Sequence, residues 1–323
     1  MSAVILDCTA VAEAVIARCR AEVAALKREG VTPRLAMLRV GEKGADLSYE
    51  RGAARLIHAV GAETQICVLD AEADQEEYIR SLRALNADPS IHGILPFRPL
   101  DHIDENRAIE AALSPEKDVD ACTAANMGKV VTGDPTGLLP CTPAAIMELL
   151  EYYAEAVRKI RGTKDPSFDP EAAGDVCAGL KVCIINKSNV IGKPLAMMLT
   201  NRYATVSIVH RMMPQAERVR TATEADVVIA GMPSRGMVTA DLVRPGALVI
   251  DASVIREKVF DENGEPVMNP ETGRQKIGVY GCCAPEVTER AGYITPVPGL
   301  GAVTSAMLAA NLAKACRLQA GTE

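Results

Sequence analysis

Residues 294–304 read Ile-Thr-Pro-Val-Pro-Gly-Leu-Gly-Ala-Val-Thr and precede a helical apolar pattern over 305–318. Pro296 and Pro298 fix φ and remove two amide donors, whereas Gly299 and Gly301 let a flat ligand approach the backbone. Free amide groups at the start of a helix bind polar ligands. The same letters also fit a simple turn that ends a strand, so their meaning depends on the rest of the chain.

Composition and charge restrict the class of ligand. The 323 residues, 48% of them hydrophobic, allow about two domains. A net charge of -7, without a basic cluster between aromatic residues, argues against a nucleic-acid surface. The N-terminal residues lack a basic region, and no apolar run reaches the roughly eighteen residues of a membrane span. We therefore expect a cytoplasmic protein that binds a small molecule, and neither nucleic acid nor membrane.

The cysteines and histidines do not form a metal-ligand pattern. There are 10 cysteines and 4 histidines, but no C-x-x-C and no pair of histidines at ligand spacing. We expect free, mostly buried thiols in a reducing compartment and no metal site. The adjacent pair Cys282 and Cys283 is unusual, and the sequence assigns it no role.

Strands and helices alternate along both halves of the chain. The first half has expected strands at 34–40, 63–69 and 91–95 and expected helices at 7–28, 47–60 and 75–85. The second half has strands at 181–185, 205–209, 226–230 and 247–251 and a helix at 193–201. Such alternation predicts an α/β fold with parallel strands. Residues 162–174 are the best linker, and turn signals at 263–264 and 272–273 predict a surface hairpin within 259–275.

Four further motifs precede the quoted segment. They are Ser48-Tyr49, PEKDVDA at 115–121, PCTP at 140–143 and SNVIGKP at 188–194. Together they resemble the bifunctional methylenetetrahydrofolate dehydrogenase and methenyltetrahydrofolate cyclohydrolase family over nearly the whole chain. The resemblance implies a folate-binding α/β domain at 1–150 with a returning helix at 303–323. It also implies a Rossmann-like NAD(P)-binding domain at 151–302 and a homodimer.

The resemblance also implies where a dinucleotide binds. It carries the cofactor role to Asn186, Lys187, Ser188, Ile191, His210, Arg211 and Thr304. A cation favours the 2′-phosphate of NADP, whereas an acidic residue favours NAD. Since Lys187 and Arg211 are basic, we expect NADP, with NAD still possible. The alternatives are that Arg211 is only a solvated loop charge and that Gly192 only lets helix and strand approach.

Folate contacts are implied at a second set of positions. These are Tyr49, Pro99, Leu100, Asp120, Pro298 and Gly299. The ring of Tyr49 can stack on a flat ligand, and the carboxylate of Asp120 can accept hydrogen bonds from a pterin. Without the resemblance, an aromatic residue at the edge of the core and a helix-capping aspartate explain these two residues equally well.

Two family residues are missing, and no catalytic residue is assigned. The family lysine four positions after Tyr49 is Ala53 here, and the glutamine of its Gln-Leu-Pro-Leu segment is Phe97. Hydrolysis of the methenyl group requires a proton carrier of tunable pKa, which a methyl side chain is not. Hydride transfer requires alignment instead. We therefore expect a dehydrogenase that oxidises methylenetetrahydrofolate and has lost the cyclohydrolase step, as in the monofunctional branch of the family.

The sequence also allows two alternatives to a dehydrogenase without cyclohydrolase activity. The first is a bifunctional enzyme that uses Arg55 or Arg98 in place of the lysine, although an arginine is effectively always protonated. The second is a regulator that binds folate or nucleotide without turnover.

Overall fold

The computed structural model describes residues 2–161, 174–270 and 272–321, so the expected linker at 162–174 lies outside them except for Gly174. Its contacts divide the chain into two compact units. The three-stranded unit comprises Thr9–Ala145 and the residues from Ala302 onward. The six-stranded unit comprises the residues up to Cys8 and Ile146–Gly301.

The three-stranded unit contains a parallel sheet in the order β3–β2–β4. Its strands are β2 (Arg34–Val40), β3 (Glu63–Leu69) and β4 (Gly93–Pro96). Its helices are α1 (Cys8–Arg28), α2 (Gly44–Ala59), α3 (Gln75–Ala87), α4 (Glu105–Ala112), α5 (Ala124–Thr132), the start of α6 (Cys141–Tyr152) and nearly all of α11 (Leu300–Ala320).

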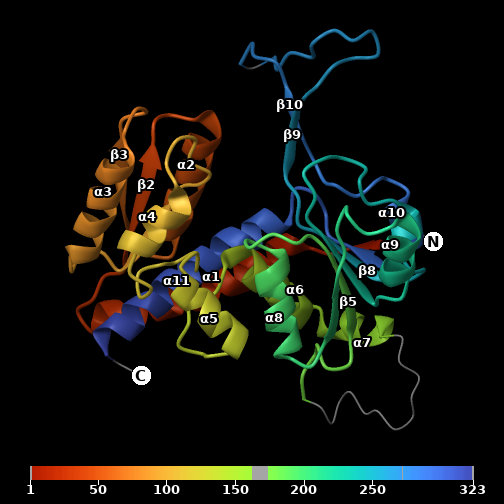
Figure 1. Cartoon of the computed structure of the whole chain (residues 1–323), viewed down its shortest axis with the longest axis horizontal. Coiled ribbons are helices and arrows are strands. Elements are labelled where there is room, and N and C mark those ends of the chain that lie inside the picture. The colour runs from red at the N-terminus through yellow and green to blue at the C-terminus, as the bar shows by residue number, and fades with distance from the viewer. Residues whose placement is uncertain (1, 162–173, 271, 322–323) are drawn as a thin grey trace. The chain divides into compact units, whose positions relative to one another are not determined.

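Strand β2 is buried on both faces, which is why it reads as a continuous apolar run. Its alternate residues, among them Leu38, pack in one core with Tyr78 and Leu82 of α3 and Ile109 of α4. Figure 1 shows α3 and α4 beside this sheet. On β4, a Cβ at Gly93 would lie 2.9 Å from the Leu312 side chain of α11. Only glycine lets these elements approach so closely.

The six-stranded unit contains a parallel sheet in the order β1–β11–β8–β7–β5–β6. Its strands are β1 (Val4–Ile5), β5 (Lys181–Ile185), β6 (Thr205–Ile208), β7 (Val227–Ala230), β8 (Leu248–Asp251) and β11 (Tyr293–Ile294). Its helices are the rest of α6, α7 (Ala154–Ile160), α8 (Gly192–Thr200), α9 (Gln215–Thr223), α10 (Val287–Arg290) and the short 3₁₀ helix η1 (Ala240–Leu242). The expected α/β class with parallel sheets and two domains is confirmed.

The first residues of the chain lie in a different unit from the one expected. We assigned 1–150 to a single domain, but Val4 and Ile5 pair with Tyr293 and Ile294 in the six-stranded sheet. Strand β1 has only two residues, and its partner is almost the whole chain away. Such a nonlocal pairing leaves no local periodicity in the sequence.

Strand order creates a topological switch point in the six-stranded sheet. From β5 the chain passes to β6 on one side and then to β7 on the other side. In open parallel sheets, ligands bind in the crevice outside the carboxyl ends of the strands at such a point. We therefore expect a ligand to bind at the loop that follows β5.

The expected surface hairpin is confirmed, and it is longer than the sequence indicated. Strands β9 (Ile255–Lys258) and β10 (Ile277–Tyr280) pair antiparallel, and bridges between 260 and 266 and between 268 and 275 extend the ladder. The hairpin forms its own two-stranded sheet and projects from the six-stranded unit (Figure 1). Gly264 and Gly273 have φ of 82° and 63°, as the turn signals required.

A buried ion pair fixes α2 against β2. Arg39 Nε lies 2.7 Å from Glu50 Oε2, and the two side chains are only 8% and 14% exposed. The same guanidinium also donates to the carbonyl oxygen of Gly41. Since α2 carries Tyr49 and Ala53, this pair sets the position of both.

We expect Glu50→Ala to lower the free energy of unfolding by about 3 kcal/mol or more, because the substitution leaves a buried, unpaired guanidinium. The matched control is Glu63→Ala, which breaks an ion pair of the same length to Arg34 with side chains 51% and 35% exposed. That change should cost about 1 kcal/mol or less. Urea unfolding measures both, and equal losses would contradict the role given to the Arg39 pair.

Candidate functional site

In the three-stranded unit, α2 carries the residues that the sequence singles out for folate. The Tyr49 side chain is 42% exposed, and its ring centroid lies 5.5 Å from that of Phe97, with the planes tilted by 56°. Desolvation raises the pKa of the Tyr49 hydroxyl, and the Cys141 thiol and Asp120 carboxylate nearby add to that rise. Tyr49 is therefore a neutral ring with one accessible side.

Ala53 lies one helical turn after Tyr49 and is 1% exposed. The position of the family lysine therefore holds a buried methyl group. Arg55 is exposed, lies about 200° further around the helix, and donates from Nε to the carbonyl oxygen of Arg51 at 3.3 Å. Arg55 consequently does not replace the missing ammonium group at Ala53.

Hydrogen bonds from neighbouring elements fix the segment 97–100, which follows β4. Phe97 is 5% exposed, and its amide donates to the Leu38 carbonyl at 2.8 Å. The Leu100 amide donates to Glu105 Oε2 at 3.1 Å, and Lys43 Nζ lies 3.4 Å from the Pro99 carbonyl oxygen. The ring of Phe97 thus occupies, beside Tyr49, the position where the family has an amide.

Asp118 organises the loop that carries Asp120. Its buried carboxylate accepts from the amides of Cys122 (3.0 Å) and Thr123 (2.9 Å), from the Thr123 hydroxyl (2.7 Å) and from Asn126 Nδ2 (3.0 Å). A buried carboxylate that is so fully hydrogen-bonded fixes its loop. This role of Asp118 was not predicted, although the acidic pair in PEKDVD at 115–120 is its signal in the sequence.

Asp120 is paired within its own unit. Arg98 Nη2 lies 3.1 Å from Asp120 Oδ2, and the side chains are 20% and 28% exposed. Burial raises the pKa of the Asp120 carboxyl, against the opposing effect of Arg98. Burial alone would lower the pKa of Arg98, but Cys122, Asp120 and Glu105 raise it overall. Arg98 is therefore a permanent cation and accepts no proton.

In the six-stranded unit, Asn186 joins the ends of two strands at the switch point. Its Nδ2 donates to the Gly231 carbonyl at 2.6 Å, beyond β7, and its Oδ1 accepts from the amides of Ser188 (2.8 Å) and Gly192 (3.2 Å). A Cβ at Gly192 would lie 1.9 Å from the Asn186 carbonyl oxygen. Glycine is required there. The close approach of helix and strand at Gly192, which the sequence left as an alternative to a cofactor role, occurs in the same loop geometry.

The remaining loop residues form a turn that leads into α8. Ser188 Oγ accepts from the Ile191 amide at 3.1 Å, and the Ser188 carbonyl accepts from the Lys193 amide at 3.0 Å. The side chain of Lys187 is exposed. The loop therefore presents a cation and a helix start at the carboxyl end of β5.

His210 and Arg211 follow β6 on the neighbouring strand. His210 Nδ1 is buried and has no hydrogen-bond partner, whereas Arg211 is exposed. An orphaned buried ring nitrogen is costly unless a ligand or water pairs with it. The unpaired Nδ1 of His210 and the close approach at Gly192 are both consistent with binding of a polar ligand at these loops.

The quoted Pro-Gly segment is divided between the units. Pro298 and Gly299 belong to the six-stranded unit and directly precede α11, whereas Thr304 lies within α11 in the three-stranded unit. A Cβ at Gly299 would lie 2.4 Å from the Pro296 carbonyl oxygen. The turn therefore requires glycine for steric reasons.

Two family models match the chain. The catalytic-domain model of tetrahydrofolate dehydrogenase/cyclohydrolase matches residues 6–120, and the NAD(P)-binding-domain model of the same family matches residues 171–320. The chain belongs to the tetrahydrofolate dehydrogenase/cyclohydrolase family. The expected resemblance is confirmed, as are the enzyme class, an NAD(P)-dependent methylenetetrahydrofolate dehydrogenase, and the cofactor and substrate classes.

Known members of this family align over nearly the whole chain. The bifunctional protein FolD of Moorella thermoacetica is 38% identical over 320 residues, which cover 98% of this chain and 100% of that protein. FolD of Alkaliphilus oremlandii is 36% identical over 299 residues and covers 92% of each chain. Both relatives are named as bifunctional proteins.

Solved structures show the same fold. The bifunctional FolD enzyme of Campylobacter jejuni superposes with a TM-score of 0.81 at 28% identity, covering 98% of this chain and 99% of that one. FolD of Trypanosoma brucei, solved with NADP and an inhibitor, gives 0.80 at 28% identity and covers 99% of each chain. Among the described residues, no helix is long and apolar enough to cross a membrane.

We expect Gly192→Ala to weaken dinucleotide binding at least tenfold, by roughly 1.4 kcal/mol, because the new methyl group forces the Asn186 loop to move. The control is Gly128→Ala in α5, where a Cβ meets nothing within 4 Å. That change should leave binding unaltered and stabilise the helix by about 0.5–1 kcal/mol. Calorimetric titration and thermal unfolding measure both effects. Unchanged affinity in Gly192→Ala would contradict the placement of the site.

Proposed function

We propose that this protein oxidises 5,10-methylenetetrahydrofolate to methenyltetrahydrofolate with NADP and lacks cyclohydrolase activity. The observation that supports the proposal is the buried methyl group of Ala53, one turn from Tyr49, beside the ring contact between Tyr49 and Phe97. The position one turn after Tyr49 on α2 holds no proton carrier, and an aromatic ring replaces the amide that would position one.

The two reactions make different demands on the protein. Hydrolysis of the methenyl group needs a group that moves protons to and from water. The oxidation moves a hydride from the bridging carbon to the nicotinamide, and this step needs alignment of the two reactants without a protein acid or base. Loss of the lysine and the glutamine therefore removes one activity and leaves the other.

The remaining folate residues serve alignment. Tyr49 offers one side of its ring for stacking on the flat portion of the substrate. Asp120 offers a carboxylate that can accept hydrogen bonds from the pterin amine and amide. The Asp118 network holds the loop of Asp120 in place. Pro99, Leu100, Pro298 and Gly299 complete the proposed substrate set.

A bifunctional enzyme with a substitute group is less well supported. Arg55 is exposed on another face of α2, and Arg98 is paired with Asp120. Lys43 is a further amine in the same unit, but its Nζ pairs with Asp101 Oδ2 at 2.9 Å. Asn186 and Gly192 retain the geometry that the dinucleotide loop requires, which supports a functional cofactor site, and the turnover assay below separates an enzyme from a binding protein.

We expect methenyltetrahydrofolate to accumulate in step with reduced nicotinamide, because Ala53 offers no proton carrier at the position of the family lysine. Absorbance of both products during turnover of methylenetetrahydrofolate measures this. Conversion of methenyl- to formyltetrahydrofolate well above the spontaneous rate would disprove the loss of hydrolysis. A Lys43→Met variant would then tell whether Lys43 is the substitute.

Ala53→Lys combined with Phe97→Gln is the reciprocal test in the same assay. A lysine at this buried position has its pKa lowered by desolvation, which suits proton transfer near neutral pH. The pair should restore measurable hydrolysis, and Ala53→Met with Phe97→Gln controls for side-chain length. Equal hydrolysis in both double variants would rule out the amine as the cause.

The choice of NADP rests on Lys187 and Arg211, two exposed cations after neighbouring parallel strands. Two partly exposed cations favour a phosphate by about 1–3 kcal/mol at low salt. We propose that the cofactor site also includes Ser188, Ile191, His210 and Thr304.

We expect Arg211→Ala to raise the KM for NADP at least about fivefold and to leave the KM for NAD nearly unchanged. The difference should shrink as ionic strength rises, because exposed charges are screened. The control is Arg220→Ala, which removes an exposed arginine of α9 paired with Glu217. More efficient turnover of NAD than of NADP by the unmodified protein would refute the cofactor assignment and leave the dehydrogenase assignment intact.

Other properties extend the same proposal. The family resemblance favours a homodimer. The free cysteines of the described residues fit a reducing compartment such as the cytoplasm. The acidic composition argues against a nucleic-acid surface.

A further inference from the structure

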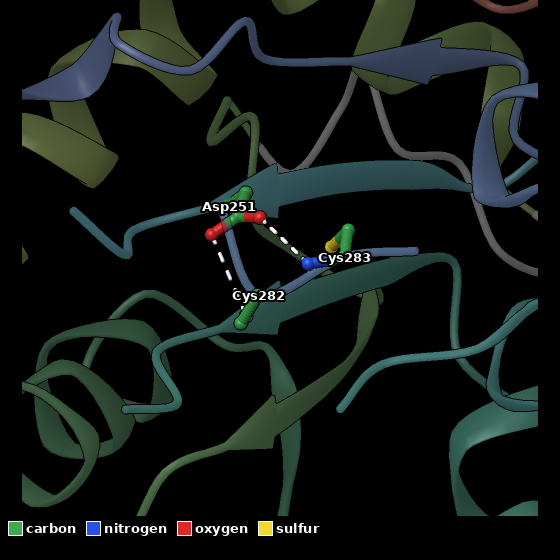
Figure 2. A group of neighbouring side chains, drawn as sticks. All are labelled: Asp251, Cys282 and Cys283. Carbon is green, nitrogen blue, oxygen red and sulfur yellow. Dashed lines mark hydrogen bonds between the residues drawn. The ribbon is translucent and has the colours of Figure 1, made fainter. Parts of the chain in front are cut away.

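The fold brings an aspartate to the adjacent cysteine pair that had no assigned role. Asp251 is the last residue of β8, and Cys282 and Cys283 follow β10. Figure 2 shows the three side chains grouped at this end of the sheet. One ligand atom from each residue lies within 4.8 Å of the other two. Asp251 and Cys282 are 31 positions apart, too far for a ligand-spacing pattern in the sequence to reveal this group.

The carboxylate is held in a fixed orientation. The amide of Cys283 donates to Asp251 Oδ2 at 2.9 Å, the amide of Ser253 donates to Oδ1 at 3.0 Å, and the Cys282 thiol lies 3.5 Å from Oδ1. A Cβ at Gly281 would lie 2.1 Å from Asp251 Oδ2, so glycine makes room for the carboxylate. Loss of the Cys282 thiol proton frees a lone pair on Oδ1 for a cation, since the Ser253 amide is then its remaining donor among these contacts.

The cluster is enclosed on one side and open on the other. Cys282 is fully buried, whereas Asp251 and Cys283 line a cavity of about 650 Å³. Polar groups from Ser234, Arg235 and Glu257 also line this cavity. It has ample room for a water molecule next to the two side chains.

We propose that Asp251, Cys282 and Cys283 form a binding site for a soft divalent cation of the Zn²⁺ class, with the fourth position open to the cavity. Four-coordinate Zn²⁺ with sulfur and oxygen ligands places its donor atoms about 3.3–3.8 Å apart. The observed cluster needs only a small contraction to reach this size. Binding exchanges the two thiol protons, which pass to solvent, for the metal ion.

The donor set selects the metal. Thiolates favour Zn²⁺ and similar soft ions, whereas Mg²⁺ and Ca²⁺ require oxygen ligands. Two thiolates and one carboxylate leave the occupied site with one net negative charge, and Arg235 is among the residues that line the adjoining cavity. The site is independent of the dehydrogenase assignment, since it uses none of the residues proposed for cofactor or folate.

The test uses the full-length protein, reduced and freed of metal with a chelator. Titration with Co²⁺ should give a thiolate charge-transfer band that saturates at one equivalent per chain, and Zn²⁺ should displace it. Cys282→Ser with Cys283→Ser should abolish the band and weaken Zn²⁺ binding at least about a hundredfold. Asp251→Asn should keep the band and weaken binding at least about tenfold. The matched control is Cys67→Ser, which removes a partly exposed thiol of β3.

A second measurement needs no variant. Zn²⁺ should protect Cys283, the thiol of the pair that lines the cavity, from iodoacetamide, as read by peptide mass spectrometry, while Cys67 stays reactive. Absence of the Co²⁺ band in the unmodified protein would overturn the proposal. So would equal Zn²⁺ affinity in the double cysteine variant, or labelling of Cys283 that Zn²⁺ leaves unchanged. Protection together with a one-equivalent band would support it even if the variants fail to fold.

Discussion

The proposed folate site depends on the hydrogen bonds that the buried carboxylate of Asp118 accepts. A buried carboxylate is tolerated only when donors surround it, and here two amides, a hydroxyl and a side-chain amide do so. One of these donors, Asn126, also donates to the Pro115 carbonyl and accepts from the Leu138 amide. A single charge thereby joins the loop at 115–121, the start of α5 and the segment before α6. Asp120 inherits its position from this arrangement.

Much of the fold could be predicted because its strands are continuous apolar runs between turn residues. The expected strands at 34–40, 63–69 and 181–185 agree with β2, β3 and β5 to the residue. The two-residue strands β1 and β11 were missed, since their stability comes from hydrogen bonds to distant partners. Helices α4 and α9 were missed because they are short and rich in polar residues.

The site was predictable where chemistry lies in one short motif and not where it depends on side chains meeting across the fold. The Asn186 loop and the glycine at 192 are adjacent in sequence, so the pattern contains their geometry. The pairing of Arg98 with Asp120 depends on two loops, and the lone Nδ1 of His210 depends on what surrounds the ring. Substitutions relative to a family motif were visible in the sequence, but the contacts that compensate for them were not.

If Asp120 binds folate as proposed, its ion pair with Arg98 means that the unoccupied site already contains a competitor for the ligand. A pterin that donates to Asp120 must share the carboxylate with a guanidinium or displace it from 3.1 Å. Part of the binding free energy is therefore the difference between two hydrogen bonds to Asp120, the one from the ligand and the one from Arg98 that it replaces. Such a site discriminates by how well a ligand reproduces the geometry of the displaced group, and a neutral analogue without the amine gains nothing from the exchange.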